Sequence, residues 1–360
     1  MTGVGAWIRY KDPIEPYEVD FAVEHYRAAI LQPWELEVAA ELKQRRPDMT
    51  VLCYKCLSST RAYEPGPIYT SGVSFAEAEA EGGRWFATRQ DGSRIQWQRY
   101  AQHWQMKVWD STYRQRWVQN VVAELADSPF DGVMADNDVF DDYYGLNLPL
   151  SDLDSLSDLR AALGELVAAA GQGLQEHDKI LVPNIAESRR TEGRWAEHSQ
   201  WGGGFEEVWL GWDPNRLFDH WTVAMQLQQL NHPGVGIFRV PTDGTDEHPN
   251  FLYGLAAFWV FGEGKGAYSA TGHDDYGQLQ YIPELDFLLG EPVGLPVRHG
   301  QAWWREFTDG FAAVNFGQDR TSRCHIKIPG GMVDGSGKPA PRKCVLYPQQ
   351  GLVVRRDGAS

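Results

Sequence analysis

Carboxylate residues stand at the ends of two β-like runs in this chain, where their types and spacing could support nucleophilic or acid–base chemistry. The run FDGVMADND carries an apolar stretch into Asp136, Asn137 and Asp138, and the run GGGFEEVWLGW places Glu206 beside Glu207. Glycoside hydrolysis needs such a pair, with one carboxylate ionised as nucleophile or base and the other protonated as general acid. Because successive side chains alternate across a strand, only one of the two glutamates can face the reacting bond.

Both carboxylate runs also have structural interpretations. The aspartate run fits a solvated acidic turn or a calcium loop, although its spacing departs from the EF-hand pattern. Each glutamate alone fits an ion pair. The hydrolase hypothesis is favoured because a carboxylate at the end of a barrel strand occupies the usual catalytic position of that fold.

Other polar and aromatic residues near the ends of β-like runs are candidates to position a ligand. Together they suit a polyhydroxylated ligand, because rings stack on sugar C–H faces while polar groups bond hydroxyls. The residues expected to bind substrate are Trp7, Tyr10, Trp34, Tyr54, Lys55, Asn137, Asp138, Asn184, Trp209, Arg239 and Tyr268.

Signatures of other chemistries fail on inspection. The glycines at 262, 264 and 266 leave a helix and enter a strand, the reverse of a dinucleotide-binding fingerprint. P-loop, HExxH and GxSxG motifs do not occur in the sequence. Cys53 and Cys56 form a lone C-x-x-C without the second pair that a zinc site needs. The sequence therefore predicts neither a metal nor a cofactor.

Eight short β-like runs alternate with helix-period stretches, which predicts an α/β fold of the TIM (β/α)8 barrel type. The runs cover residues 6–10, 28–32, 50–57, 130–136, 179–185, 204–210, 235–240 and 266–269. In such a barrel the carboxyl ends of the strands carry the active site, so the candidates above should gather at one face.

The sequence predicts four helices between these runs. Pro33 is expected to open one that continues to residue 46, and Pro47 to close it. Tyr113, Trp117, Val121 and Leu125 form an apolar stripe at i, i+4 spacing, and a second stripe follows from Leu159 to Leu174. The segment 251–261 is apolar almost all round, which predicts a buried helix.

Two segments depart from a minimal barrel. Residues 58–105 form an aromatic-rich insert after the third strand, which we expect at the face that carries the active site. After about residue 290 the pattern becomes Pro- and Gly-punctuated β structure, so we expect a barrel over 1–290 and a small antiparallel β-domain over 291–360. Cys324 and Cys344 lie in two runs of that domain that could pair, with free thiols favoured over a disulfide.

The composition disfavours nucleic acid and membranes as binding partners. The 360 residues carry a formal net charge of −16, which repels nucleic acid and anionic lipid, and no stretch is apolar enough for membrane insertion. The 15 tryptophans give an excess of flat rings that suits carbohydrate. The start lacks a signal peptide, so we expect a cytoplasmic protein if the start is native and a secreted one if a signal was removed. Oligomeric state is not set by the sequence.

Several motifs together resemble a known family. KVWDSTYRQRWVQNVVAEL followed by FDGVMADN, the strand WGGGFEEVW, and LGEPVGLPVRHGQAWWREFTDGFAAVNFG are similar to segments of hypothetical glycosyl hydrolase family 15. The resemblance covers nearly the whole chain. It implies a glycoside hydrolase in which Asp136 is the nucleophile and Glu206 or Glu207 the acid/base. Glu207 is preferred because it lies as far past Gly203 as Asp136 lies past Gly132.

The expected substrate is an oligo- or polysaccharide, and the placement of the two carboxylates resembles that of barrels that retain anomeric configuration through a covalent glycosyl-enzyme. Two alternatives stay open. One is a catalytically inactive barrel that binds carbohydrate through the same residues, and the other is a transglycosylase, which needs the same carboxylates. The sugar, the linkage and endo or exo action are not set by the sequence.

Overall fold

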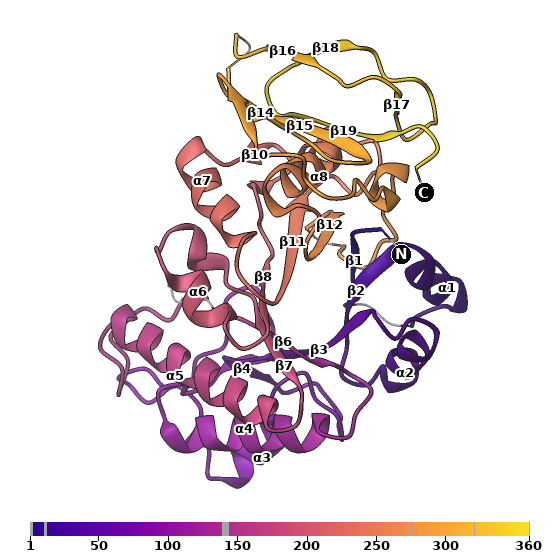
Figure 1. Ribbon diagram of the computed structural model, residues 1–360. Helices are drawn as coiled ribbons and strands as arrows, with labels where there is room; N and C mark the ends of the chain where they lie inside the picture. Colours follow the sequence, from indigo (N-terminus) through magenta and orange to yellow (C-terminus); the bar gives the residue numbers. More distant parts are fainter. Residues whose placement is uncertain (1–2, 11–12, 139–143, 274, 320, 360) are drawn as a thin grey trace. The chain divides into compact units, whose positions relative to one another are not determined.

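The computed structural model describes residues 3–10, 13–138, 144–273, 275–319 and 321–359 (Figure 1). Its central element is an eight-stranded parallel sheet with the strand order β7-β6-β3-β2-β1-β12-β11-β8. Parallel bridges from Leu181 to Gly202 and from Asn184 to Phe205 join β7 to β8, so the strands follow the order of a TIM barrel. The strands are β1 (Gly5–Ile8), β2 (Tyr26–Leu31), β3 (Thr50–Cys56), β6 (Gly132–Asp136), β7 (Ile180–Pro183), β8 (Gly203–Glu206), β11 (Val235–Pro241) and β12 (Ala267–Thr271). The predicted fold class is confirmed.

The strands are buried almost throughout, as expected for a parallel sheet covered by helices. Each predicted β-like run contains a strand, but some ends differ. The sixth strand stops at Glu206, and the chain turns at Glu207 instead of continuing to residue 210. The eighth strand continues to Thr271, two residues beyond the expected end. These shifts decide which residues stand at strand ends.

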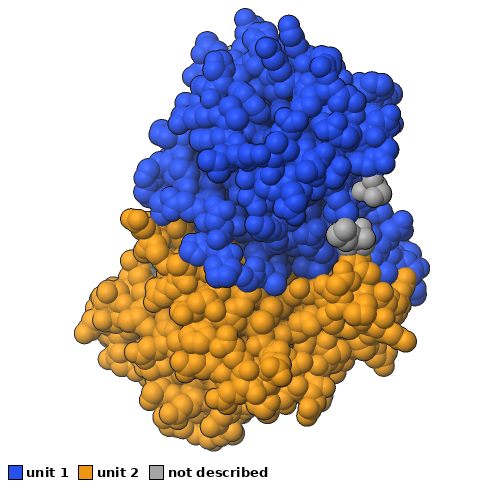
Figure 2. Space-filling model, viewed as in Figure 1, with its two compact units in different colours: residues 1–29, 206–360 blue, residues 30–205 orange. Residues whose placement is uncertain are grey.

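The chain divides into two compact units, which are described separately below (Figure 2). Unit 1 comprises residues 1–29 and 206–360, and unit 2 comprises residues 30–205. The boundary that the sequence suggested near residue 290 falls inside unit 1.

The helices of unit 2 are α2 (Leu36–Arg45), α3 (Phe75–Ala80), α4 (Ser111–Leu125), α5 (Leu156–Gln175) and α6 (Arg194–Ser199), with a 3-10 turn η1 (Ala186–Arg189). The predicted stripe on α4 is confirmed, since Tyr113, Trp117, Val121 and Leu125 are buried. Asp110 caps this helix by accepting a hydrogen bond from the Thr112 backbone N–H (2.7 Å).

The expectation that Pro33 opens α2 is wrong. Pro33 and Trp34 form a turn, and α2 begins only at Leu36 after an N-cap at Glu35. The proline is compatible with either position, because its fixed φ fits a turn as well as a first helical residue. Periodicity alone therefore predicts the start of α2 three residues before its observed start at Leu36.

The insert of unit 2 is closed at its base by a pair of short antiparallel strands, β4 (Ser59–Arg61) and β5 (His103–Gln105). Helix α3 begins after Ser74, whose hydroxyl accepts a hydrogen bond from the Glu77 backbone N–H (3.1 Å). Further antiparallel bridges from Phe86 to Met106 and from Gln96 to Trp104 continue the same layer. Since β4 follows β3 after two residues, the insert starts at the carboxyl end of a barrel strand.

Unit 1 contains α1 (Pro16–His25), α7 (His220–Gln229) and α8 (Pro249–Gly262), a 3-10 turn η2 (Pro283–Asp286), and the short strand pair β9 (Gly211–Asp213) and β10 (Arg216–Leu217). Helix α8 is buried nearly all round, as predicted, because it packs against β11 and β12 on one side and β15 and β19 on the other (Figure 1). Among the described residues, no helix is long and apolar enough to span a membrane.

The C-terminal segment of unit 1 is antiparallel, as predicted. Its five-stranded sheet has the order β13 (Val297–His299), β14 (Ala302–Glu306), β15 (Gly310–Asn315), β19 (Gln350–Arg356) and β17 (Met332–Val333). A second pair joins β16 (Cys324–Lys327) to β18 (Lys343–Leu346). Its register puts Cys324 opposite Leu346 and Cys344 opposite Ile326, so the two cysteines are diagonal neighbours, and both are free thiols.

Candidate active site

The carboxylate of Asp136, at the end of β6, is held by donors from separate segments of unit 2. Oδ1 accepts hydrogen bonds from the Asn184 amide (3.0 Å) and the Asn137 backbone N–H (2.8 Å). Oδ2 accepts one from the Tyr54 hydroxyl (2.7 Å), which comes from β3. Donors that converge on a carboxylate stabilise its ionised form and fix its orientation. The arrangement suits a charged group that acts as nucleophile or base.

Arg61, in strand β4 of the insert, extends this network. Its Nη2 donates to the Tyr54 hydroxyl oxygen (3.1 Å), and its Nη1 donates to Glu64 Oε1 (3.4 Å). Burial acts to lower the pKa of Arg61, but the ionisable groups around it, Tyr54 foremost, outweigh burial and raise it. The positive guanidinium of Arg61, which donates to the Tyr54 oxygen, makes that hydroxyl a stronger donor to Asp136. Sequence reasoning missed Arg61 because its contact with Tyr54 depends on how the insert folds back.

Asn137 leaves β6 in a left-handed conformation (φ 65°), which asparagine adopts more readily than most residues. Its side-chain Nδ2 donates to Cys56 Sγ (3.1 Å), and its carbonyl accepts from the Ser58 hydroxyl (3.0 Å). The Tyr144 hydroxyl donates to its Oδ1. These bonds fix the backbone beside Asp136, a role that needs no substrate contact.

The C-x-x-C motif lies within β3 with both thiols buried. Burial raises the pKa of the Cys53 thiol to about 12 and raises that of Cys56 as well. A thiol must ionise to bind zinc, so neither environment favours a metal. Within the described part of the chain, no group of three or more His, Cys, Asp or Glu residues is placed to hold a metal ion.

Asp138 is fully buried in unit 2 and bridges two side chains of α6, Arg194 and His198. Its Oδ1 accepts from Arg194 Nη2 (2.9 Å), and its Oδ2 lies 2.5 Å from His198 Nδ1. All three side chains are buried. A buried carboxylate with both oxygens engaged by its own fold is a structural link between β6 and α6.

We expect Asp138→Asn to lower the free energy of unfolding by about 3–5 kcal/mol, because it breaks a buried ion pair by removing one partner, the carboxylate that contacts Arg194. Chemical denaturation measures the change. Asp152→Asn is the matched control, since its 2.6 Å ion pair with Lys107 joins a carboxylate that is 42% exposed. That pair should contribute less than about 1 kcal/mol. Equal losses in the two variants would contradict the structural role of Asp138.

Glu206 and Glu207 differ in their surroundings within unit 1. Glu206 is fully buried, and its Oε2 accepts from Gln229 Nε2 (3.1 Å) at the end of α7, so it faces the helix layer. Glu207, the next residue, is partly exposed, and its Oε1 accepts from the Tyr276 hydroxyl (2.5 Å). The two side chains thus contact different parts of unit 1, Glu206 the end of α7 and Glu207 the loop after β12.

Arg239 and Tyr276 support Glu207. The buried Arg239 donates from Nη1 to the Glu207 carbonyl (2.9 Å) and from Nε to Thr271 Oγ1 (2.8 Å). Its guanidinium carbon lies 4.5 Å from the Tyr276 ring centroid, and the Tyr10 ring meets Tyr276 edge-on with centroids 5.3 Å apart. Sequence reasoning missed Tyr276, which lies in the loop after β12; extending the search of strand ends by a few residues would have included it.

The remaining residues expected to bind substrate lie in different environments. Trp7, Trp209 and Tyr268 are almost fully buried, and Trp209 packs against Phe238 and Tyr268 with ring centroids 5.3 and 6.3 Å apart. Rings in such positions contribute to the core of unit 1. The Tyr268 hydroxyl donates to the Phe251 carbonyl of α8 (2.8 Å), so its side chain faces that helix.

In unit 2, Lys55 is buried and its ammonium donates to Glu124 of α4 (2.7 Å), so it faces the helix layer. Its neighbour Tyr54 faces Asp136, in line with strand alternation. Trp34 is 40% exposed in the turn after β2. The structure therefore groups Tyr54, Asn137 and Asn184 around Asp136, but not Lys55.

His103, in β5, has an unusual proton affinity. Burial, followed by the Arg61 charge, lowers the pKa of its imidazole to about 4. The ring is therefore neutral across the physiological range. Its Nε2 lies 3.0 Å from the Tyr63 hydroxyl.

The depressed pKa of His103 predicts acid sensitivity. The unfolded chain takes up a proton near pH 6.5 that the folded chain does not bind until about pH 4, so stability falls as pH decreases through this window. With partial solvent screening we expect a loss of about 1 kcal/mol between pH 7 and pH 5. Denaturation of wild type and His103→Gln at both pH values measures it. An equal pH response in the two proteins would show that His103 is not the group involved.

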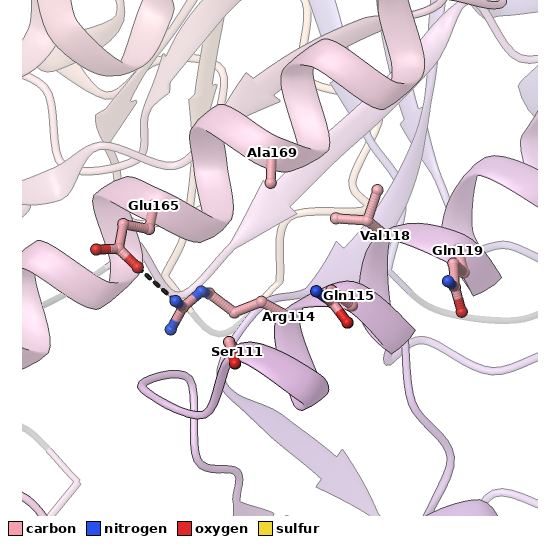
Figure 3. A pocket seen from close by; sticks show the side chains of 7 residues that line it. All are labelled: Ser111, Arg114, Gln115, Val118, Gln119, Glu165 and Ala169. Carbon is pink, nitrogen blue, oxygen red and sulfur yellow. Dashed lines mark hydrogen bonds and ion pairs between the residues drawn. The ribbon is translucent and has the colours of Figure 1, made fainter.

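A groove on the helix layer of unit 2 has a different character (Figure 3). Its cavity, of about 460 Å³, is lined by α4 and α5 residues, and Arg114 and Glu165 form an ion pair across it. The other lining residues are Ser111, Gln115, Val118, Gln119 and Ala169. No aromatic ring lines the groove, so it lacks the flat faces on which sugars stack.

Comparisons with known proteins agree with this fold. Among solved structures, the α-amylase of Geobacillus thermoleovorans matches with TM-score 0.51 at 8% identity, over 98% of this chain and 97% of that one. The cycloalternan-forming enzyme of Listeria monocytogenes matches with TM-score 0.51 at 11% identity, over 99% of this chain and 41% of that one. At these identities the likeness shows the fold alone.

The glycoside hydrolase domain of PelA from Pseudomonas aeruginosa has 16% identity and TM-score 0.47, over 78% of this chain and 98% of that one. No curated protein matches the chain. The model of hypothetical glycosyl hydrolase family 15 matches residues 43–311, which is well over half of the sequence and includes Asp136 and Glu207. The chain therefore belongs to hypothetical glycosyl hydrolase family 15.

Proposed function

We propose that this chain, a glycoside hydrolase by family, cleaves glycosidic bonds in an oligo- or polysaccharide with Asp136 as nucleophile and Glu207 as acid/base. The observation that carries the proposal is the network on Asp136. Three hydrogen bonds, from Tyr54, Asn184 and the Asn137 backbone, stabilise the ionised carboxylate that a nucleophile requires.

The surroundings of Glu207 support the complementary role. Its Oε1 accepts from the Tyr276 hydroxyl, and the guanidinium of Arg239 donates to the Glu207 carbonyl and to Thr271. A carboxyl group must be able to hold and release a proton to act as general acid and then base. Glu206 is less suited, because it is buried against Gln229.

Sheet topology gives further support. Strands β6 and β8 both pair with β7 in parallel, so their carboxyl ends leave the sheet at the same edge. Asp136 ends β6, and Glu207 directly follows β8. In a TIM barrel this edge carries the catalytic residues.

The reaction follows from these roles. Asp136 attacks the anomeric carbon while Glu207 protonates the departing oxygen, which forms a glycosyl-enzyme and releases the first product. Glu207 then deprotonates a water molecule, which displaces Asp136 and frees the sugar. Two inversions at the same carbon give overall retention.

The activity is tested by screening the purified protein against aryl glycosides and cell-wall polysaccharides for release of aglycone or reducing sugar. Hydrolysis supports the proposal. Polysaccharide binding without hydrolysis would instead indicate an inactive carbohydrate-binding barrel, and products longer than the substrate would indicate transglycosylation.

Retention is tested by proton NMR of the first product anomer. We expect the configuration of the substrate in that product, before mutarotation. An inverted product would reassign Asp136 from nucleophile to general base.

A further inference from the structure

The insert of unit 2 exposes aromatic side chains that the proposed catalytic roles do not use. Tyr63 and Tyr100 are 53% and 42% exposed, although large rings of folded proteins are usually well buried. They are joined through His103, with ring centroids 5.7 Å from Tyr63 and 5.4 Å from Tyr100. Trp97 lies beneath, with centroids 6.2 Å from Tyr100 and 5.9 Å from His103. We call these four residues the aromatic platform.

The backbone of the platform is held in one conformation. Arg99 and Gln102, which flank Tyr100, have left-handed φ values of 69° and 61°, a conformation that non-glycine residues disfavour. The loop is tied by backbone hydrogen bonds from Trp97 N–H to the His103 carbonyl (2.9 Å) and from His103 N–H to the Tyr100 carbonyl (3.2 Å). Unfavourable conformations that the fold enforces are typical of functional sites.

The platform is rigid on its inner side as well. Trp97 is buried and stacks on Tyr144 with centroids 3.7 Å apart and an interplanar angle of 4°. Its indole N–H donates to Gln105 Oε1 (2.6 Å). Rings fixed before a ligand arrives lose little conformational entropy on binding.

The platform connects directly to the Asp136 network. Arg61, which donates to the Tyr54 hydroxyl, also lies beside the Tyr63 hydroxyl and counteracts the effect of burial on the pKa of Tyr63. Tyr54 in turn donates to Asp136. A ligand on Tyr63 would therefore lie on the same segment of the insert that orients the proposed nucleophile.

Its chemistry fits an uncharged glycan. Tyrosine rings offer flat faces for sugar C–H groups, and their hydroxyls offer directional bonds. The His103 ring is neutral in this environment, and the chain's net charge of −16 repels polyanionic glycans. Protein partners usually bury a larger contiguous apolar core than two tyrosines provide.

We propose that the aromatic platform is a binding subsite for an uncharged glycan chain, used for sugar units beyond those at the cleaved bond. This inference rests on the proposed function, because it assigns the insert a share of the same polysaccharide. It predicts that the enzyme favours long substrates over short ones through Tyr63 and Tyr100.

Binding is tested with full-length Asp136→Asn by affinity electrophoresis in gels that contain mixed-linkage β-glucan, galactomannan or polygalacturonate. Adding Tyr100→Ala or Tyr63→Ala should weaken binding to a neutral polymer about threefold to tenfold each. Tyr100→Leu, which keeps apolar bulk without a flat ring, should bind as weakly as Tyr100→Ala. Tyr347→Ala is the matched control, since Tyr347 is 50% exposed in the C-terminal segment of unit 1 and should not affect binding.

Turnover of the otherwise wild-type enzyme provides the second measurement. Tyr100→Ala should raise KM for the polymer by a similar factor and leave kcat/KM for a small aryl glycoside unchanged. Absence of hydrolysis on any substrate, together with Tyr100-dependent polymer binding, would reject the proposed function and support the platform.

Four results would overturn the platform: no binding to either neutral polymer, binding to polygalacturonate alone, wild-type affinity in Tyr100→Ala, or an equal loss in Tyr347→Ala. Circular dichroism and thermal unfolding of each variant show whether it is folded. If Tyr100→Ala does not fold, Tyr100→Leu and Tyr63→Ala carry the test.

Discussion

Replacing Asp136 by asparagine should lower kcat by about a thousandfold or more while leaving the protein folded. The amide has nearly the shape of the carboxylate: its oxygen can still accept from Asn184 and the Asn137 backbone N–H, and its NH2 group can donate to the Tyr54 hydroxyl oxygen, which reverses that one hydrogen bond. The asparagine side chain is uncharged, so it cannot attack the anomeric carbon as the carboxylate does. Steady-state kinetics on the best substrate of the screen, with denaturation curves alongside, separates lost chemistry from lost stability.

Asp127→Asn is the matched control for this variant. Asp127 is an exposed aspartate in the turn between α4 and β6, at the opposite end of the same strand. The substitution removes the same charge without touching the Asp136 network, so kcat should be unchanged. If Asp136→Asn retains activity within about tenfold of wild type, the nucleophile must be a different residue.

The carboxyl ends of strands could be found from the sequence because strand and helix patterns alternate so regularly. The rule that barrel strands carry function at this end selected Asp136 directly. Strand alternation further separates the candidates on β3, because Tyr54 and Lys55 are consecutive and face opposite sides: Tyr54 contacts Asp136, and Lys55 contacts Glu124 in the helix layer.

Errors in strand ends account for other misplaced candidates. The sequence pattern places Tyr268 near the end of the eighth strand, but β12 continues to Thr271, and the Tyr268 hydroxyl contacts α8 instead. The same pattern places Trp209 in the sixth strand, but β8 ends at Glu206. Apolar residues that follow a strand keep the hydrophobic pattern going, so periodicity cannot show where backbone pairing stops.

Arg61 and Tyr276 were missed for a different reason. Both lie in connections, and neither contact follows from a local periodic pattern: Arg61 returns to Tyr54, seven positions earlier, and Tyr276 contacts Glu207, 69 positions away. Local patterns report burial and turns, but not which loop residue returns to a strand end. Such residues are predictable only as a class, as polar or aromatic side chains in long connections at the functional end of a barrel.

Glu207→Gln should produce a loss that depends on the leaving group. The glutamine cannot protonate the departing oxygen, so hydrolysis of natural glycosidic bonds should fall about 100-fold to 10,000-fold. An aryl glycoside with a strongly acidic phenol needs no proton to leave, so the step that forms the glycosyl-enzyme should be nearly as fast as in wild type. Hydrolysis of that intermediate then becomes slow, because water has lost its base, and a burst of phenol release should precede a slow steady state.

Glu206→Gln distinguishes this role from a general effect of losing charge next to the strand. Glu206 is buried and accepts a hydrogen bond from Gln229, so its substitution should change the free energy of unfolding. It should not make activity depend on the leaving group. Leaving-group dependence in Glu206→Gln instead of Glu207→Gln would mean that the buried glutamate reaches the substrate in the working enzyme, and the roles of the two would be exchanged. If both variants show leaving-group dependence, protonation of the leaving group depends on both glutamates, and the assignment of Glu207 alone is wrong.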